Sequence, residues 1–153
     1  MQFEQLKLSN QICFPIYAAS RLITREYQPH LEKLGITYPQ YLVLMVLWEQ
    51  DGITVNDIAG KLILNTNTVT PLLKRMEMLG IISRRRSMTD ERKVLITLTA
   101  KGKAMREQAA DIPPELMKSL QNNAISLDEL MVMRDHLNHL IGFLKDKESE
   151  NML

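Results

Sequence analysis

The chain contains one cysteine, Cys13, and a tyrosine follows it four residues later. A thiol reacts with oxidants only as the thiolate, and a place in the first turn of a helix lowers its pKa from about 8.5. Tyr17 then lies one turn further on the same helix face. Its O–H can donate a hydrogen bond to a thiolate and to the sulfenate that oxidation forms. The pair predicts an oxidation-sensitive thiol, although a buried cysteine is usually an inert hydrophobic residue.

Short polar side chains gather between residues 65 and 70, at the expected start of a helix. Asn and Thr side chains there can read base edges in the major groove, which is about 12 Å wide and admits one helix. The free N–H groups of the helix start favour a phosphate, and two basic residues follow one turn later. The candidate DNA-binding residues of this segment are Asn65, Thr66, Asn67, Thr68, Thr70, Lys74 and Arg75.

A basic segment, residues 84–93, holds five basic residues against two acidic ones. Arg84 and Arg86 alternate along an expected strand and so point to the same face. Arg92 near the tip could enter a minor groove, where A·T tracts concentrate negative potential. Taken alone, an Asn/Thr cluster is usually a capped turn, and an arginine run is usually a solvated face. In the order helix, turn, helix, basic hairpin, they predict a surface for double-stranded DNA.

The helix that must position the thiol is expected to start between Asn10 and Ile12 and to end at Gly35. Pro15 limits this start, because a proline inside a helix costs about 3 kcal/mol and is tolerated only in the first turn. Cys13 therefore falls in the first turn.

Residues 37–99 are expected to form a winged helix-turn-helix. Thr37 opens a helix with a capping-box pattern, and the apolar run Tyr41–Trp48 makes this helix part of the core. Thr54 caps the next helix, with Asp57 three residues later.

The DNA-reading helix is expected to have Asn67 as its cap, so that Pro71 falls in the first turn, and Gly80 ends it. Residues 81–86 and 93–98 read as two strands that a polar tip joins into a hairpin.

Thr99 is expected to cap a further helix that breaks near residues 113–114, and Ser126 starts the last helix with a capping box. The terminal helices, about 10–34 and 100–145, are more apolar than one small core requires. One winged unit also buries too little surface for the usual affinity for an operator, which two half-sites provide. We therefore expect a homodimer; the alternative is that both helices simply cover the winged part.

The composition fits one domain, 1–153, mostly α with a small antiparallel β wing. Hydrophobic residues make up 45% and charged residues 24%, as in soluble globular proteins, and the net charge of +1 alone argues nothing about nucleic acid. No apolar run is long enough for a membrane span and no signal-peptide pattern is present, so a cytoplasmic protein is expected. We expect no cofactor: one cysteine excludes an intramolecular disulfide framework and a Cys-rich zinc site, and His136 and His139 lack an evident third metal ligand.

The sequence resembles the MarR family of bacterial regulators over nearly the whole chain. The residues that carry the resemblance are Leu73-Lys74-Arg75-Met76-Glu77, Gly80, Asp90-Glu91-Arg92 and Leu98-Thr99. The resemblance implies a winged-helix homodimer that dimerises through its terminal helices and represses nearby genes. It also implies that Arg92 enters the minor groove and that Asp90 braces the wing arginines.

A closer resemblance is to the organic hydroperoxide resistance regulators. It rests on Gln11-Ile12-Cys13-Phe14, Tyr17, Ser20-Arg21, Tyr27 and Ile36-Thr37-Tyr38-Pro39-Gln40-Tyr41. In that branch an early cysteine is oxidised, and two tyrosines hydrogen-bond near it, one of them from the partner subunit; Cys13, Tyr17 and Tyr27 match these positions. The chain departs from the pattern at Pro15 and has no second cysteine, so a low-molecular-weight thiol must complete the switch.

Three hypotheses follow. The first is a repressor that an organic hydroperoxide releases from DNA through Cys13. The second is a repressor that a small aromatic ligand releases, with Cys13 structural. The third is a thiol peroxidase that uses Cys13 catalytically; it lacks a resolving cysteine and an evident general base, so we do not expect an enzyme.

Overall fold

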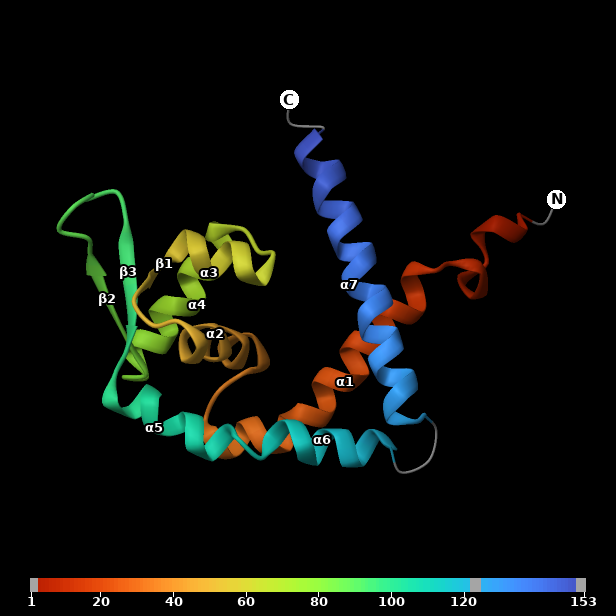
Figure 1. Ribbon diagram of the computed structural model, residues 1–153, viewed down its shortest axis with the longest axis horizontal. Coiled ribbons are helices and arrows are strands. Elements are labelled where there is room, and N and C mark those ends of the chain that lie inside the picture. Colours follow the sequence, from red (N-terminus) through yellow and green to blue (C-terminus); the bar gives the residue numbers. More distant parts are fainter. Residues whose placement is uncertain (1–2, 122–124, 151–153) are drawn as a thin grey trace. The chain divides into compact units, whose positions relative to one another are not determined.

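The computed structural model describes residues 3–121 and 125–150. It is mostly helical with a small antiparallel sheet, which confirms the predicted fold class (Figure 1). The chain divides into two compact units, residues 1–112 and 113–153. In chain order the elements are η1 (Glu4–Leu6), η2 (Leu8–Asn10), α1 (Cys13–Leu34), α2 (Tyr38–Glu49), β1 (Ile53–Thr54), α3 (Val55–Leu62), α4 (Thr66–Met78), β2 (Ile82–Arg86), β3 (Val94–Leu98), α5 (Ala100–Ala109), α6 (Ile112–Gln121) and α7 (Leu127–Glu150).

Helix α1 begins at Cys13, so the cysteine lies in the first turn as predicted. Pro15 is the third residue of the helix, where a backbone N–H would have no helical partner. Gly35 ends the helix in a left-handed conformation with a φ of 68°. Pro29 lies inside α1, a feature that the sequence analysis did not consider; it removes one helical hydrogen bond.

The core of the first unit is built around α2. The Gln40 side chain accepts a hydrogen bond from Thr37 N at 2.8 Å, and this contact fixes the start of α2. The apolar residues of α2 then pack against α3 and α4. The largest fully buried side chains are Leu44, Leu47, Ile58, Leu73, Met76, Ile81, Ile82 and Ile96.

Helix α3 starts with the reciprocal cap that the sequence predicts. Asp57 N donates to Thr54 Oγ1 at 3.1 Å, and Thr54 N donates to Asp57 Oδ2 at 2.9 Å. The hydrogen bonds from the Thr54 hydroxyl and backbone hold the pKa of Asp57 below its usual value. Because the carboxylate stays ionised, this cap remains intact at neutral pH.

Helix α4 starts earlier than the sequence predicts. Its N-cap is Asn65 rather than Asn67, so Pro71 is the sixth residue of the helix and lies beyond the first turn. The prediction for Pro71 is therefore wrong. Its missing N–H leaves the exposed Asn67 carbonyl without a helical partner, and water can satisfy that group. The predicted end is confirmed: Gly80 has a φ of 69°.

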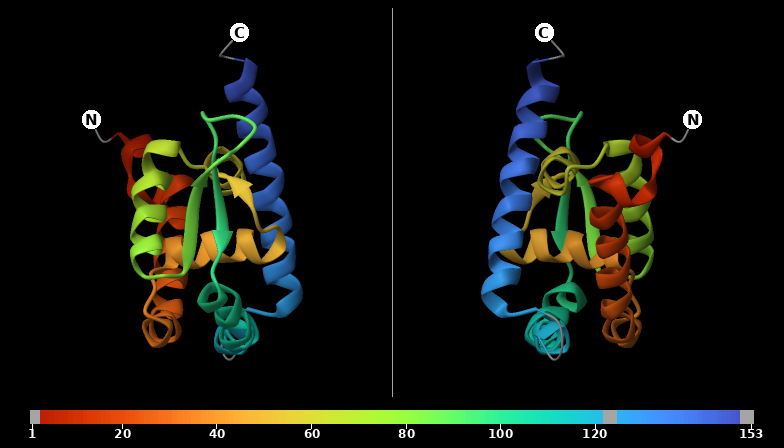
Figure 2. Two further views of the ribbon diagram at one scale, coloured as in Figure 1. Left: turned by 90° about the vertical axis from the view of Figure 1, so that its left-hand side faces the viewer. Right: turned by 90° about the vertical axis from the view of Figure 1, so that its right-hand side faces the viewer.

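The sheet has three strands in the order β1-β3-β2, all antiparallel. The hairpin of β2 and β3 is confirmed, with Ile82 opposite Leu98 and Arg86 opposite Val94. Strand β1, which no sequence pattern indicated, is a pair of residues in which Ile53 lies opposite Ile96. Figure 2 shows β3 between the other two strands and α4 beside β2, which fixes the wing next to α4.

In the C-terminal part of the chain, the helical region breaks at residues 110–111, just before Pro113 and Pro114, as predicted. Both prolines fall in the first turn of α6, where they cost little. The capping box of the last helix is also confirmed, since Glu129 N donates to Ser126 Oγ at 3.3 Å and Ser126 N donates to Glu129 Oε2 at 2.8 Å.

The turn between α3 and α4 contains a strained residue. Ile63 is left-handed with a φ of 55° and is 54% exposed. A β-branched residue in this region costs about 1–2 kcal/mol, whereas Asn tolerates it. We expect Ile63→Asn to raise the free energy of unfolding by about 1 kcal/mol in urea titrations at a fixed protein concentration. The control is Leu64→Asn, which relieves no strain and should lower that free energy; equal losses in both variants would contradict the strain at Ile63.

Candidate DNA-binding surface and thiol site

The first turn of α4 presents the predicted polar side chains to solvent. Asn65, Thr66, Asn67 and Thr68 are exposed and Thr70 is half-buried. The opposite side of α4 is anchored in the core by buried residues: Val69, Leu72, Leu73 and Met76. Lys74 and Arg75 are also exposed, one turn beyond the polar start. The helix therefore offers short hydrogen-bonding groups at its tip and cations along its side, as major-groove reading requires.

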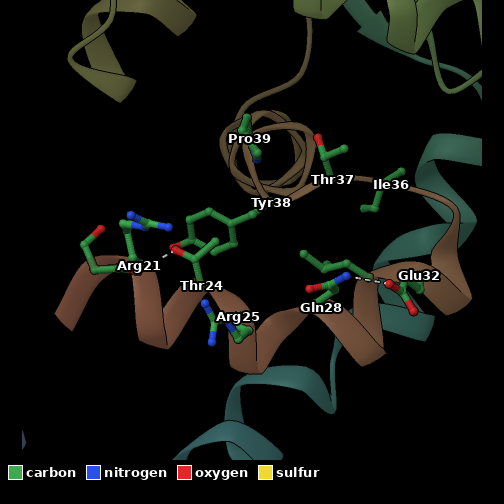
Figure 3. Close-up of a pocket in the computed structure, with 11 residues that line it drawn as sticks. Arg21, Thr24, Arg25, Gln28, Glu32, Ile36, Thr37, Tyr38 and Pro39 are labelled. Carbon is green, nitrogen blue, oxygen red and sulfur yellow. Dashed lines mark hydrogen bonds between the residues drawn. The ribbon is translucent and has the colours of Figure 1, made fainter. Parts of the chain in front are cut away.

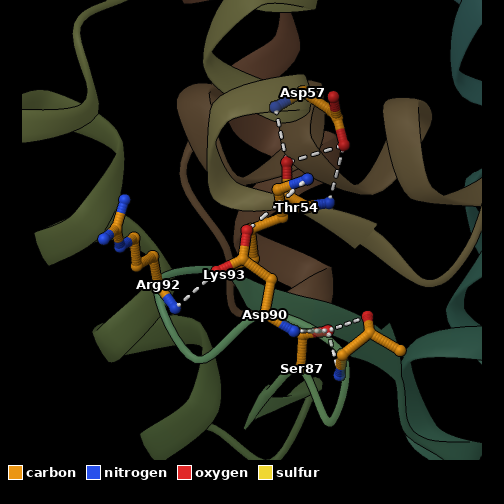
Figure 4. A network of polar contacts seen from close by, with 7 residues as sticks. Thr54, Asp57, Ser87, Asp90, Arg92 and Lys93 are labelled. Atoms are coloured by element: carbon orange, nitrogen blue, oxygen red, sulfur yellow. Dashed lines mark hydrogen bonds and ion pairs between the residues drawn. The ribbon is translucent and has the colours of Figure 1, made fainter.

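The wing tip is ordered by a small polar network (Figure 4). The buried Ser87 Oγ accepts hydrogen bonds from Thr89 N at 3.3 Å and from Asp90 N at 3.4 Å. Asp90 Oδ1 accepts from Arg92 N at 3.1 Å, and Asp90 Oδ2 lies 3.9 Å from Lys93 Nζ. Asp90 thus holds the wing residue Arg92 through its backbone N–H and also pairs with Lys93.

The arginines of the basic segment differ in their environments. Arg86 and Arg92 are exposed, as contact with DNA requires. Arg84 is half-buried: its Nη1 lies 3.5 Å from Glu77 Oε2, and its backbone N–H donates to Glu77 Oε1 at 3.2 Å. Sequence reasoning treated Arg84 and Arg86 as equivalent because they share a strand face; it missed Glu77, which comes from α4 and fastens β2 to that helix.

The thiol of Cys13 is exposed, and it makes no hydrogen bond within the described residues. Tyr17, one turn later, is also exposed. Its hydroxyl accepts a hydrogen bond from Arg21 Nη1 at 3.0 Å, and the guanidinium carbon of Arg21 lies 5.5 Å from the centre of the Tyr17 ring. Arg21, which sequence reasoning assigned no role, thus places a positive charge directly beside Tyr17.

Tyr27 lies apart from this pair. It comes fourteen positions after Cys13 on the helix, a distance of about 21 Å along the axis, so the two can meet only between subunits. Tyr27 packs against Tyr38 and Tyr41 of α2, with ring centres 4.9 Å and 5.8 Å away. Burial, followed by the two neighbouring phenols, raises the pKa of Tyr27 to about 12. Tyr27 therefore stays protonated and able to donate a hydrogen bond at neutral pH.

The protein family described as transcriptional regulator SarA/Rot matches residues 25–108, more than half of the chain. The organic hydroperoxide resistance transcriptional regulator of Bacillus subtilis is 47% identical over 129 residues, which cover 84% of this chain and 88% of that protein. The chain belongs to the MarR/SarA-type family of transcriptional regulators. The predicted membership is confirmed, and the matched relatives are regulators rather than enzymes.

Solved structures agree with this MarR/SarA-type assignment. Reduced AbfR bound to DNA has a TM-score of 0.77 and 38% identity, and the match covers 94% of this chain and 99% of that chain. AbfR, a protein of Staphylococcus epidermidis, is also known in a disulfide form, with a TM-score of 0.61, 37% identity, and coverage of 94% and 93%. The present chain is accordingly a DNA-binding transcriptional regulator with a winged helix.

The regulator also has a pocket of about 560 Å³ between α1 and the start of α2 (Figure 3). Arg21, Thr24, Arg25 and Gln28 line it from α1, and Tyr38 lines it from α2. Two guanidinium groups next to an aromatic ring suit a small aromatic anion. Sequence reasoning named an aromatic ligand as an alternative but did not locate this pocket, because its walls come from two helices.

The remaining predicted features concern membranes and metals. Of the helices within residues 3–121 and 125–150, none has the length and apolar character that crossing a bilayer demands. His136 and His139 line a pocket on α7 together with Leu140 and Phe143. The described parts of the chain contain no cluster of three or more His, Cys, Asp or Glu side chains suited to a metal.

Proposed function

We propose that this regulator is a cytoplasmic repressor that binds a palindromic operator as a homodimer and leaves it when an organic hydroperoxide oxidises Cys13. The observation that carries the proposal is an exposed thiol in the first turn of α1, on a chain that also exposes a complete winged-helix surface. The similarity to a hydroperoxide resistance regulator supports the choice of oxidant.

In the proposed complex, the polar start of α4 enters the major groove and Arg92 enters the neighbouring minor groove. Asn67 and Thr68 contact base edges, while Lys74 and Arg75 contact the backbone. Support comes from the exposure of all five side chains and from the wing network, which holds the backbone of Arg92 in place.

The homodimer is supported by apolar side chains that a monomer leaves in water. On α1 these are Phe14, Ile16, Leu22 and Ile23, and on α7 they are Leu127, Met131, Val132, Met133, Leu140, Ile141, Phe143 and Leu144. Exposed apolar surface of this extent marks an interface. A two-fold pair presents two copies of α4, which matches a palindromic site with half-sites one helical turn apart.

The proposed switch is a two-step reaction at Cys13. The thiolate attacks the outer oxygen of the hydroperoxide; with one proton taken up, the sulfenic acid and an alcohol form, and the sulfur loses two electrons. A low-molecular-weight thiol then displaces the hydroxyl as water and leaves a mixed disulfide. The outside thiol is needed because the chain has no second cysteine. Tyr17 of the same subunit and Tyr27 of the partner subunit donate hydrogen bonds to the reduced sulfur, and Phe14 and Ile16 provide apolar walls.

Release requires only a modest coupling energy. A hundredfold loss of operator affinity corresponds to about 2.7 kcal/mol, which is the scale of a few lost hydrogen bonds to a charged sulfur. Oxidation removes those bonds, shifts α1, and changes the distance between the two copies of α4.

The test is operator binding by gel shift before and after treatment with cumene hydroperoxide and cysteine. We expect the native protein to lose at least tenfold in affinity and Cys13→Ser to keep its affinity. Mass spectrometry of the peptide that contains Cys13 should show the mixed disulfide. If Cys13→Ser releases DNA as the native protein does, the thiol switch is wrong.

The pocket beside Arg21 and Arg25 favours a second candidate, release by a small aromatic acid. Benzoate serves as the probe. This candidate, in which Cys13 is structural, would be favoured if benzoate released Cys13→Ser from operator DNA and if Arg25→Gln abolished that release.

A further inference from the structure

A cationic pocket of about 220 Å³ lies where α3, α4 and the wing meet. Thr54 and Asn56 line it from the start of α3, and Thr70 lines it from α4. Arg84, Arg92 and Lys93 line it from the wing. All of these residues belong to the first unit. We call it the wing-base pocket.

The positive charge of this pocket is only partly neutralised. Lys93 lies 3.9 Å from Asp90, and both side chains are largely exposed. Within the described residues, the Arg92 side chain pairs with no carboxylate. Asp57, the acid of α3, accepts hydrogen bonds from the N–H and hydroxyl of Thr54 and also attracts Lys93, so it offsets part of that lysine's charge. The first N–H groups of α3 add further positive potential at the same place.

Arg84 forms one wall and keeps unused hydrogen-bonding capacity. Its side chain is 20% exposed, and its Nε is buried without a partner. The ion pair with Glu77 is long, with 3.5 Å between Arg84 Nη1 and Glu77 Oε2. An unpaired buried donor is unfavourable, so the arrangement suits an oxyanion that draws on the guanidinium when it arrives.

The position of the pocket identifies that oxyanion. Adjacent major and minor grooves are separated by a single sugar–phosphate strand. If α4 reads the major groove and Arg92 the neighbouring minor groove, this strand must pass between them, over the wing-base pocket. We propose that the pocket binds one phosphodiester of the operator backbone in each half-site. This inference rests on the proposed mode of DNA binding.

Glu77 positions Arg84 for this contact. Because Glu77 receives both the backbone N–H and the guanidinium of Arg84, it sets the separation between α4 and β2. The wing-base pocket, α4 and Arg92 are thereby held at fixed distances from one another. Binding of a free anion does not require fixed distances between these three parts. Binding of a DNA strand that contacts all three of them does.

The experiment compares Arg84→Gln with Arg85→Gln, a change of equal charge on the opposite face of the same strand. Operator duplexes selected by the native protein are titrated by fluorescence anisotropy from 50 to 300 mM salt. Loss of one phosphate contact per half-site should reduce the slope of log K against log salt by about 0.9 per site, or about 1.8 per dimer, in Arg84→Gln only. Arg84→Lys keeps the charge, so its salt slope should equal that of the native protein. This result would also show that the position tolerates a substitution.

Single methylphosphonate substitutions then locate the phosphate. One position per half-site should weaken the native protein and Arg85→Gln but leave Arg84→Gln unaffected. Inorganic phosphate, added at constant ionic strength, should compete no better than chloride.

Three results would overturn the proposal. If operator binding occurs but every methylphosphonate effect persists in Arg84→Gln, the pocket is not a backbone site. If inorganic phosphate releases DNA through Arg84, the pocket serves a free anion instead. If the native protein binds no operator DNA at all, the proposed function itself fails, and the wing-base site fails with it.

Discussion

Gly102→Ala should lower the free energy of unfolding by about 3 kcal/mol, which is the upper end of the usual cost of overpacking. A Cβ at this position would lie far inside contact distance of the Ile81 carbonyl oxygen and 3.0 Å from Leu98 Cδ2. The carbonyl is a backbone atom and cannot turn away as a flexible side chain could. Urea titrations followed by circular dichroism at a fixed protein concentration measure the effect.

The substitution should also weaken DNA binding, because Gly102 lies at a junction of four elements. Its carbonyl accepts from Trp48 Nε1 at 2.9 Å, and its N–H donates to Thr99 Oγ1 at 3.1 Å. The Thr99 hydroxyl in turn lies 2.7 Å from Gly80 O, at the end of α4. A displaced α5 would therefore move the end of α4 and the start of the wing together.

Gly60→Ala is the matched control. Gly60 lies in α3, and a Cβ there meets nothing within 4 Å. Since Ala is favoured over Gly inside a helix, this change should stabilise the protein by about 0.5–1 kcal/mol. If Gly102→Ala proves as mild as Gly60→Ala, the close approach of α5 to the Ile81 carbonyl is not a constraint.

The parts of the fold that the sequence predicted correctly depend on contacts between near neighbours. The caps Thr54/Asp57 and Ser126/Glu129 close over three residues, and the left-handed Gly80 ends its own helix. A few neighbouring residues determine such contacts, which depend little on the rest of the chain.

The features that the sequence analysis missed depend on distant residues. Strand β1 is too short to show alternation, and it exists because Ile53 pairs with Ile96. Asn65 and Asn67 are equally good caps in isolation. The structure uses Asn65 and holds Pro71 inside the helix, a choice that the local pattern does not determine.

The candidate site divides in the same way. Exposure of the polar start of α4 follows from helical periodicity, because the apolar residues occupy the other face. The state of Arg84 does not follow, since its partner Glu77 belongs to another element. Tyr27 was named through a family resemblance alone, and its packing against Tyr38 and Tyr41 required the position of α2.

Arg92→Ala should cause the largest loss of operator affinity among single changes on the wing. One arginine contact to base edges contributes about 1–3 kcal/mol, and a dimer makes it twice, so the loss should be about 2–6 kcal/mol, or roughly thirtyfold to more than ten-thousandfold. The fold should be unaffected, because Arg92 is held through its backbone N–H, which alanine retains. Anisotropy titrations at one salt concentration, with unfolding curves as a check, measure both quantities.

The sequence of the operator supplies the sharper comparison. If Arg92 reads a narrow minor groove, replacing A·T pairs under the wing by G·C pairs should weaken the native protein about tenfold or more and leave Arg92→Ala almost unchanged. Arg85→Ala, from the opposite face of β2, should discriminate between the two duplexes as the native protein does. If Arg92 senses the width of the minor groove, its removal must abolish the preference for A·T pairs. An Arg92→Ala variant that still prefers the A·T duplex would therefore show that other residues read this groove.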